Sequence, residues 1–263
     1  MTHAVPDGEP DLIEDEIVLH GRIMPASNAT FVGEVGGPHG VRVVYKPIAG
    51  ERPLWDFPGG NLASREVAAY LVSEAFGWDV VPETWLRDGP HGRGMVQRWQ
   101  EPDEDQVAVT LVPAGGLPAG WLHVFDGVDG HDQAVSLIHE DSEPLRRMAV
   151  FDIVVNNADR KGGHVLEMSD GHRFGVDHGI TFHTDHKLRT VLWGWLGEAL
   201  TEDELGALRR IREELRGGLG AALSSHLTDL EIDAVARRCD RLAGRGVMPG
   251  PRGESPAIPW PPF

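Results

Sequence analysis

The sequence predicts an α+β protein with two lobes, an antiparallel N-terminal sheet that carries one helix and a mainly helical C-terminal half. Short runs of β-branched and aromatic residues, separated by Gly-containing turns, fill residues 16–99. Apolar residues recur at helical spacing after residue 142. The 263 residues are 41% hydrophobic and 25% charged, which is typical of a globular chain that buries a sizeable core.

The N-terminal lobe is expected to span residues 16–99. Runs at 17–23, 30–35 and 41–46 predict an antiparallel meander of three strands. A helix is predicted over 61–76, capped by Asn61 or Ser64 and ended by Gly77. Strands at 82–87 and 94–99 would complete a five-stranded sheet.

The C-terminal lobe is expected over residues 100–247. Residues 100–143 are acidic, contain Gly and Pro and have weak periodicity, so we interpret them as a connector with room for one short helix. Ser142 as a helix cap, followed by Pro144, then predicts a helix whose packing face runs from Leu145 to Ile153.

Two Thr-x-x-Glu capping boxes, at 201–204 and 228–231, predict two further helices. The second of these helices is expected to end at Gly244. Residues 248–263 are rich in Pro and are expected to form a tail without regular structure.

Charge and composition exclude several classes of partner. The chain has 24 Lys and Arg against 41 Asp and Glu, a net charge of −17 that repels polyanions, so nucleic acid and anionic lipid surfaces are disfavoured. Cys239 is the only cysteine, residues 1–16 are acidic without the apolar core of a signal peptide, and no window approaches 18 uninterrupted apolar residues. We expect a soluble cytoplasmic protein without stable membrane association.

Lysine is rare in this chain. Among the 24 basic residues only Lys46, Lys161 and Lys187 are lysines. Where arginine is the default cation, a lysine indicates a site that needs a compact point charge, although coding bias and chance explain each of the three equally well.

The stretch most indicative of chemistry is 156–164, followed by 171–179. Polar residues and glycines directly behind an apolar helix predict a loop held rigidly at its ends, where reactive groups are often displayed. Residues 173–177 are expected to form a short strand that leads Asp177 into a Gly turn. Asp159 and Asp177 would then face one cleft.

Combined with the N-terminal lobe, this arrangement suits phosphoryl transfer, which needs positive charge on phosphates, carboxylates that hold metal and a carboxylate near the acceptor hydroxyl. Lys46 would reach the α- and β-phosphates of a nucleotide, and Glu66 would pair with Lys46. The turn between the first two strands could close over the nucleotide through backbone N–H groups. The residues of this turn are Ala26, Ser27, Asn28, Ala29 and Thr30.

The order of lysine strand, glutamate helix, Asp-Arg loop and a second Asp before x-Gly resembles the phosphatidylinositol 3/4-kinase-like superfamily, which includes type II phosphatidylinositol 4-kinases and HipA-like serine kinases. Asn157-x-Asp159-Arg160 is similar to its catalytic loop, and residues 176–182 are similar to its metal-binding segment. Within it, the chain is most similar to an actinobacterial family that carries the same label, over roughly residues 16–245.

The resemblance implies a two-lobed protein-kinase-like fold that binds ATP and a divalent metal, Mg²⁺ or Mn²⁺. By this resemblance Asp159, in a loop with Asn157, orients or deprotonates the acceptor, and Asp177 binds the metal. Lys46 binds phosphate and Glu66 supports it. An interlobe hinge would hydrogen-bond adenine through its backbone, and the residues matched to this hinge are Val96, Gln97, Arg98 and Trp99.

One position departs from the superfamily pattern. His164 stands where relatives place the Asn that supplies the second metal ligand, and an imidazole suits Mn²⁺ and other transition metals better than Mg²⁺. Lys161 would suit the γ-phosphate as a point charge.

The chain is therefore predicted to be an ATP-dependent kinase that phosphorylates a hydroxyl of a protein or small soluble acceptor. The acceptor and the choice between phosphoryl and AMP transfer stay open. One alternative is a pseudokinase that binds nucleotide for regulation, consistent with His164. Another is a metal-dependent hydrolase built from the histidines at 164–186, although this alternative leaves Lys46 and Glu66 without a role.

Overall fold

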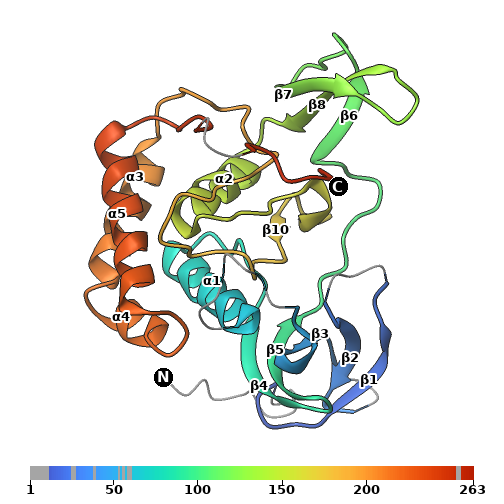
Figure 1. The fold of residues 1–263 in the computed structure, drawn as a ribbon, viewed down its shortest axis with the longest axis vertical. Helices are drawn as coiled ribbons and strands as arrows, with labels where there is room; N and C mark the ends of the chain where they lie inside the picture. The colour runs from blue at the N-terminus through green and yellow to red at the C-terminus, as the bar shows by residue number, and fades with distance from the viewer. Residues whose placement is uncertain are drawn as a thin grey trace.

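The computed structural model describes residues 12–24, 28–37, 40–52, 54, 57, 61–252 and 256–263. Figure 1 shows an antiparallel sheet built from the N-terminal residues at one end of the molecule and the helices α3, α4 and α5 at the opposite side, with α1 and α2 between them. The protein is thus an α+β protein with an N-terminal antiparallel sheet and a helical C-terminal part, as the sequence predicts.

The N-terminal sheet has five antiparallel strands in the order β1-β2-β3-β5-β4. Their bounds are β1 Ile17–Arg22, β2 Phe31–Val35, β3 Val41–Pro47, β4 Thr84–Gly89 and β5 Gly92–Arg98. A 3₁₀ turn, Ile48–Gly50, follows β3. The predicted five-stranded sheet is confirmed, and β3 lies at its centre between β2 and β5.

Helix α1, Leu62–Phe76, joins this sheet to the rest of the molecule. The side chain of Asn61 accepts a hydrogen bond from the Ser64 backbone N–H, and Gly77 ends the helix in the left-handed region at φ 67°. Both predicted ends are confirmed, with Asn61 as the cap. Helix α1 contacts β4 and β5 on one side and α3 and α4 on the other, so most of its length is buried.

The interpretation of residues 100–143 as a connector with one short helix is wrong. This region forms a second antiparallel sheet, in the order β6-β8-β7, which Figure 1 shows projecting from the body of the molecule. The strands are β6 Val109–Pro113, β7 Trp121–Val128 and β8 Ala134–Glu140. The alternation typical of a strand is hidden because β7 has an irregular register between His123 and Phe125.

The C-terminal part contains four helices and a two-stranded sheet within the described residues. They are α2 Glu143–Val155, β9 Val165–Glu167, β10 Arg173–Gly175, α3 Glu202–Glu214, α4 Gly218–Leu223 and α5 Asp229–Arg245, with a 3₁₀ turn at Gly162–His164. Both capping boxes are formed, at the starts of α3 and α5. The end of α5 was predicted wrongly: the helix continues through Gly244 because Gly246 supplies the left-handed C-cap, at φ 64°.

The large hydrophobic core joins α1, α2, α3 and α5. Over the described residues of 248–263 the tail forms no helix or strand, in agreement with the prediction, but it packs against the body. The carbonyl of Pro262 accepts a hydrogen bond from Gly162 N–H at 2.8 Å. None of the helices in the described ranges has the length and apolar character needed to cross a membrane. The boundaries at 99 and 247 between the proposed lobes and the tail stay predictions.

Candidate functional site

Three charged side chains from distant parts of the chain meet at Lys46. Its amino group lies 2.8 Å from Glu66 Oε1, on α1, and also donates to Asp177 Oδ1, in the loop after β10. Glu66 is buried, at 3% side-chain exposure, whereas the Asp177 side chain is 52% exposed. The sheet, the helix and the C-terminal loop thus converge on one cation with an accessible carboxylate beside it.

The two carboxylates determine the charge state of this cluster. Burial alone would lower the pKa of Lys46, but Asp177 and Glu66 outweigh burial and raise that pKa above its ordinary value. The Lys46 cation in turn holds the pKa of Asp177 well below its usual range. Lys46 is therefore cationic and Asp177 anionic at neutral pH.

Glu66 also fixes the loop that carries Asp177. Its second oxygen, Oε2, accepts a hydrogen bond from the backbone N–H of His178 at 2.8 Å. Asp177 itself has a positive φ of 63°, a strained conformation that surrounding contacts must maintain. A Cβ on Gly179 would lie 3.1 Å from Leu62 Cβ, so the glycine allows this loop to approach the start of α1.

The loop with Asp159 begins where α2 ends. Asn156 is in the left-handed region at φ 59°, and its side chain donates to the carbonyls of His183 and Asp185. Asn157 accepts a hydrogen bond from the Asp159 backbone N–H at 2.9 Å and donates to Asp152 Oδ1 at 2.9 Å. Asn157 therefore holds the backbone at Asp159, and Asn156 connects the start of this loop to residues 183–185.

His164 connects the two loops. Its Nδ1 donates to the Asp159 carbonyl at 2.8 Å, and its Nε2 lies 3.5 Å from Asp177 Oδ2. Lys161 Nζ lies 3.9 Å from Asp159 Oδ2. Burial raises the pKa of Asp159, a rise that Lys161 and His164 oppose, and burial lowers the pKa of His164. The predicted catalytic and metal-binding residues are thus brought together.

The imidazole of His164 and the carboxylate of Asp177 together suit a divalent ion. No group of three or more His, Cys, Asp or Glu side chains is arranged to hold a metal in the part of the chain that the structure describes. However, His164 Nδ1 carries the ring proton, because it donates to the Asp159 carbonyl. Nε2 of the neutral ring therefore has a free lone pair, and it faces a carboxylate oxygen of Asp177. Two facing electron donors are where a cation fits, and the backbone hydrogen bond on the other ring nitrogen is the usual support of a histidine ligand.

The residues that hold the two loops together were not predicted from the sequence. Arg160 is fully buried and forms a two-armed ion pair with Asp152, which is also fully buried. Arg160 also donates to the carbonyl of His164 at 2.9 Å and to His178 Nε2 at 2.6 Å. A carboxylate within the apolar stripe of a helix, as at Asp152, was the available signal, because a buried carboxylate requires a partner.

The segment predicted as a hinge does not form an open linker. Val96, Gln97 and Arg98 lie in β5, which pairs with β3 on one edge and β4 on the other, and Trp99 N–H donates to the Arg42 carbonyl. The backbone of Val96 and Gln97 is thus paired within the sheet, and the contact of this segment with adenine stays a prediction. The chain leaves the sheet only after Arg98.

Part of the predicted nucleotide-covering turn lies outside the described residues, namely Ala26 and Ser27. The remaining residues pack on the chain after β3. Ala29 N–H donates to the Gly50 carbonyl at 3.2 Å, and Asn28 Oδ1 accepts from Arg52 N–H at 2.9 Å. Thr30 is buried beside them.

The other histidines of the region do not gather around a metal. His172 Nε2 contacts the carbonyl of Asp79, His178 contacts Arg160, and His183 Nδ1 accepts from the Asp185 backbone. The largest cavity among those described, of about 460 Å³, lies between Trp78, Arg147 and His172 and includes neither Lys46 nor Asp177. These positions give the hydrolase alternative no metal site within the described ranges.

Known proteins similar to this chain include one solved structure and one curated relative. No protein-family model matches the sequence. A crystal structure of the Helicobacter pylori proinflammatory kinase CtkA is similar with a TM-score of 0.43 and 12% identity, covering 91% of this chain and 95% of that chain. Protein Rv2133c of Mycobacterium tuberculosis is 48% identical over 262 residues, which cover 96% of this chain and 94% of the relative. At that identity and coverage, the chain belongs to the same family as protein Rv2133c.

Proposed function

We propose that the chain is an ATP-dependent phosphotransferase that phosphorylates a hydroxyl group. The observation that carries this proposal is the position of the Lys46 amino group between Glu66 and Asp177. A strand lysine paired to a helix glutamate, next to a carboxylate able to hold metal, is the arrangement that kinases use to position the phosphates of ATP. A surface lysine at a strand end would have no reason to pair with a buried glutamate.

Each residue has a role in this reaction. Lys46 would contact phosphate oxygens, and Glu66 would fix its rotamer and the loop of Asp177. Asp159 would orient the acceptor hydroxyl and accept its proton, on a loop held by Asn157. Lys161, near Asp159, would offset charge at the γ-phosphate.

Asp177 and His164 would hold the divalent metal. When bound, the ion would neutralise negative charge on the phosphates. Because one of the two donors is an imidazole nitrogen, Mn²⁺ would be preferred over Mg²⁺.

The finer assignment within kinases is to the phosphatidylinositol 3/4-kinase-like superfamily. Its support is the Asn157-x-Asp159-Arg160 loop and the similarity of residues 176–182 to the metal-binding segment. The acceptor we propose is a protein or small soluble molecule in the cytoplasm, since the net charge of −17 disfavours an anionic membrane surface.

A nucleotide-binding pseudokinase is the second candidate function. The observation that favours it is His164 at the position of a metal-binding Asn, hydrogen-bonded by its Nδ1 to Asp159. In that case nucleotide binding would occur without transfer.

The test is incubation of the chain with Mn²⁺ and ATP labelled at the γ-phosphate, alone and with pools of proteins and small hydroxyl compounds. Labelled product that appears with the wild type and is lost in Asp159→Asn supports the kinase. Nucleotide binding without release or transfer of label would support the pseudokinase. Absence of metal-dependent nucleotide binding would contradict both.

A further inference from the structure

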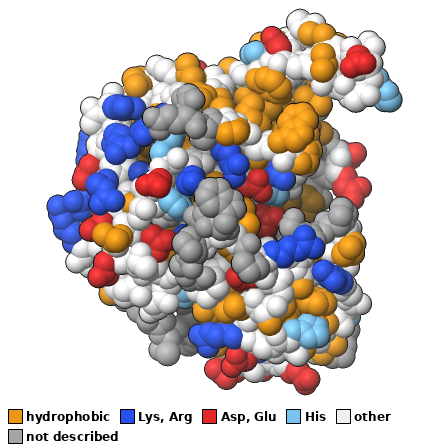
Figure 2. All heavy atoms as spheres, viewed as in Figure 1, with side chains coloured by type: hydrophobic (Ala, Val, Ile, Leu, Met, Phe, Trp, Pro, Cys, Tyr) orange, Lys and Arg blue, Asp and Glu red, His pale blue; other side chains and the backbone are white. Residues whose placement is uncertain are grey.

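A basic depression lies beside α2, between α5, residues 186–188 and residues 249–252. Its lining includes Arg238, Arg241 and Arg245 from α5, with Arg252 and His186 beside them. The three α5 residues stand at i, i+3 and i+7, so they share one face of the helix. Figure 2 shows Lys and Arg side chains gathered on the side of the molecule that carries α5 in Figure 1.

This concentration of positive charge stands out in a chain with a net charge of −17. None of the four arginines forms an ion pair with a carboxylate that the structure describes. The next acid on α5, Asp240, is paired with Arg212 on α3 instead. The depression is therefore a region of uncompensated positive charge.

Arg238 provides the strongest indication of a ligand. Only 9% of this residue is exposed, and its Nη2 is buried without a hydrogen-bond partner among the described residues. Burial lowers the pKa of Arg238 to about 10, so the side chain is still cationic at neutral pH. A buried cation with an unused donor is unfavourable unless an anion accompanies it.

The other donors of Arg238 hold it in place. Nε donates to the Val154 carbonyl at 2.6 Å, in the last turn of α2, and Nη1 donates to the His183 carbonyl at 3.1 Å. Asn156 donates to the same His183 carbonyl. Arg238 is thus held between the last turn of α2 and residue 183, where it lines the depression.

The depression is small and partly open to solvent. Its cavity volume is about 40 Å³, which leaves room for one small group such as a phosphate, so the rest of a larger ligand would lie outside it. Ile153, Leu188 and Leu242 add apolar surface beside the arginines. A group with two or more negative oxygens suits several guanidinium forks, and apolar surface accommodates the non-polar part of the same molecule.

We propose that this depression is a binding site for a phosphate-bearing anion, separate from the candidate site at Lys46. The phosphate would be contacted by Arg241, Arg245 and Arg252 at the rim, with the charge of Arg238 behind it. The phosphate group belongs to a soluble phosphorylated compound or to the headgroup of a lipid, and the experiment below distinguishes these sources.

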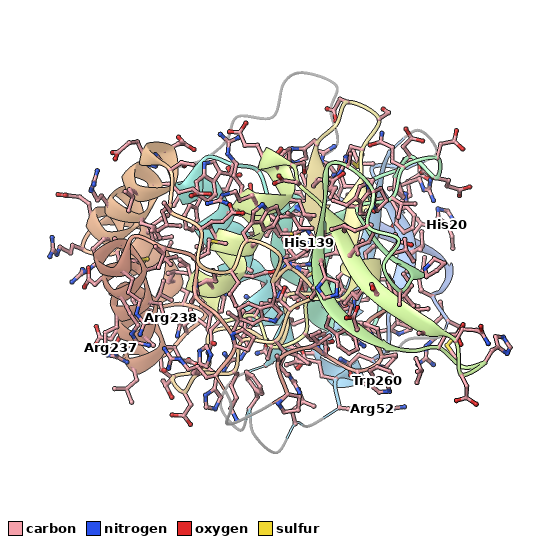
Figure 3. The ribbon with its side chains drawn as sticks, turned by 90° about the horizontal axis from the view of Figure 1, so that it is seen from above. His20, Arg52, His139, Arg237, Arg238 and Trp260 are labelled. Atoms are coloured by element: carbon pink, nitrogen blue, oxygen red, sulfur yellow. The ribbon has the colours of Figure 1, made fainter. Side chains whose placement is uncertain are left out.

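The experiment is calorimetric titration of the full chain with inorganic pyrophosphate, together with sedimentation with phosphatidylcholine vesicles that contain phosphatidic acid. The test variants are the double variant R241A/R245A, at exposed positions, and Arg238→Gln. The matched control is Arg237→Ala, which removes an exposed arginine one position earlier on the same helix but outside the depression. Figure 3 labels Arg237 and Arg238 side by side on α5. Lys46→Ala removes the phosphate-binding cation of the other candidate site.

Pyrophosphate is expected to bind both the wild type and Lys46→Ala. Its affinity should fall about tenfold or more in R241A/R245A, because charge-assisted contacts are lost. The affinity of Arg237→Ala should stay within about twofold of the wild type. Vesicle binding with the same dependence on Arg241 and Arg245 would assign the phosphate to a lipid. If Arg238→Gln unfolds the chain, R241A/R245A carries the test. The proposal is overturned if neither pyrophosphate nor vesicles bind, if Arg237→Ala weakens binding as much as the double variant, or if Lys46→Ala alone abolishes it.

Discussion

Arg160 and Asp152 form an ion pair through two hydrogen bonds, 2.8 Å from Nε to Oδ2 and 2.9 Å from Nη2 to Oδ1, with no exposed surface on either side chain. The Nη1 group of Arg160 donates to the carbonyls of His164 and Val176, and Nη2 also donates to His178 Nε2. Because these carbonyls belong to the two loops that carry Asp159 and Asp177, the pair determines how far apart the two loops lie.

Removing Asp152 is therefore expected to destabilise the whole protein. Asp152→Ala leaves the Arg160 cation buried without its partner, and we expect the free energy of unfolding in urea to fall by about 3–5 kcal/mol. Asp240→Ala is the control, since it breaks the exposed pair with Arg212 and should cost less than about 1 kcal/mol. Equal losses in the two variants would show that the buried pair does not support the fold.

Substitutions of Asp159 and Asp177 are expected to affect different steps, turnover in the first case and nucleotide binding in the second. Asp159→Asn should lower turnover by about 10²-fold or more, because the proton acceptor is lost, while metal-dependent nucleotide binding persists. Asp177→Ala should abolish that binding, because a metal-holding carboxylate is removed. Turnover and calorimetric nucleotide binding measured on both variants check this difference, and identical losses in both measurements would contradict the assignment of roles.

His164 is expected to set the metal preference. His164→Asn replaces an imidazole nitrogen by an amide oxygen, which suits Mg²⁺, so the ratio of nucleotide affinity in Mg²⁺ to that in Mn²⁺ should rise. His131→Asn, at an exposed position on the turn between β7 and β8, serves as the control. An unchanged ratio in His164→Asn would exclude His164 as a ligand.

Gly94 on β5 allows that strand to approach β3 at Lys46. A Cβ at residue 94 would lie 2.5 Å from the Lys46 carbonyl oxygen and 2.7 Å from Pro47 Cα, so Gly94→Ala must separate the two strands there. We expect a loss of about 1–3 kcal/mol in thermal or urea unfolding and weaker nucleotide binding. Gly21→Ala, where nothing lies within 4 Å of the added Cβ, should leave nucleotide binding unchanged. Wild-type binding by Gly94→Ala would mean that the Lys46 strand is not positioned by this contact.

His139, labelled in Figure 3, is expected to make stability depend on pH. Its Nδ1 donates to the Glu140 carbonyl and its Nε2 accepts from Gly194 N–H, so the buried ring is neutral, and burial lowers its pKa. Below the unfolded pKa of about 6.5, the unfolded chain takes up a proton on this histidine that the folded chain does not. The stability that His139 contributes is therefore fully present above that pH. It is lost as the pH falls from there toward the folded pKa, by up to about 1.4 kcal/mol per pH unit.

The measurement is urea unfolding between neutral and mildly acidic pH. His139→Gln should show a shallower decrease than the wild type, whereas His131→Gln, at an exposed position, should follow the wild type. Parallel curves for wild type and His139→Gln would show that His139 does not contribute.

Local signals explain which parts of the fold could be predicted. Asn61 and the two capping boxes satisfy backbone groups within a few residues, and the strands up to β3 show their alternation directly. The sheet β6-β8-β7 was missed because its burial depends on distant contacts, such as the ring of His139 against Trp195. A bulge in β7 also interrupts the pattern.

In the candidate site, too, local signals could be predicted from the sequence and distant contacts could not. Lys46, Glu66 and Asp177 could be selected because charged residues at the ends of apolar elements are visible in the sequence. The role of Arg160 could not be predicted, because it depends on a partner in α2 and on two carbonyls that are near it only in the folded chain. The pairing of β5 on both edges could not be predicted either, because strand pairing is a tertiary property.

Lys46, Glu66, Asp177 and Asp159 converge on the place where we propose that a nucleotide and its metal bind. The most direct test is a crystal structure of the chain with a non-hydrolysable ATP analogue and Mn²⁺, in which the anomalous signal locates the metal. We predict Mn²⁺ on Asp177 and His164, phosphate oxygens on Lys46, and the γ-phosphate directed toward Asp159. A nucleotide bound elsewhere, with Lys46 still paired only to Glu66 and Asp177, would contradict the proposed nucleotide site.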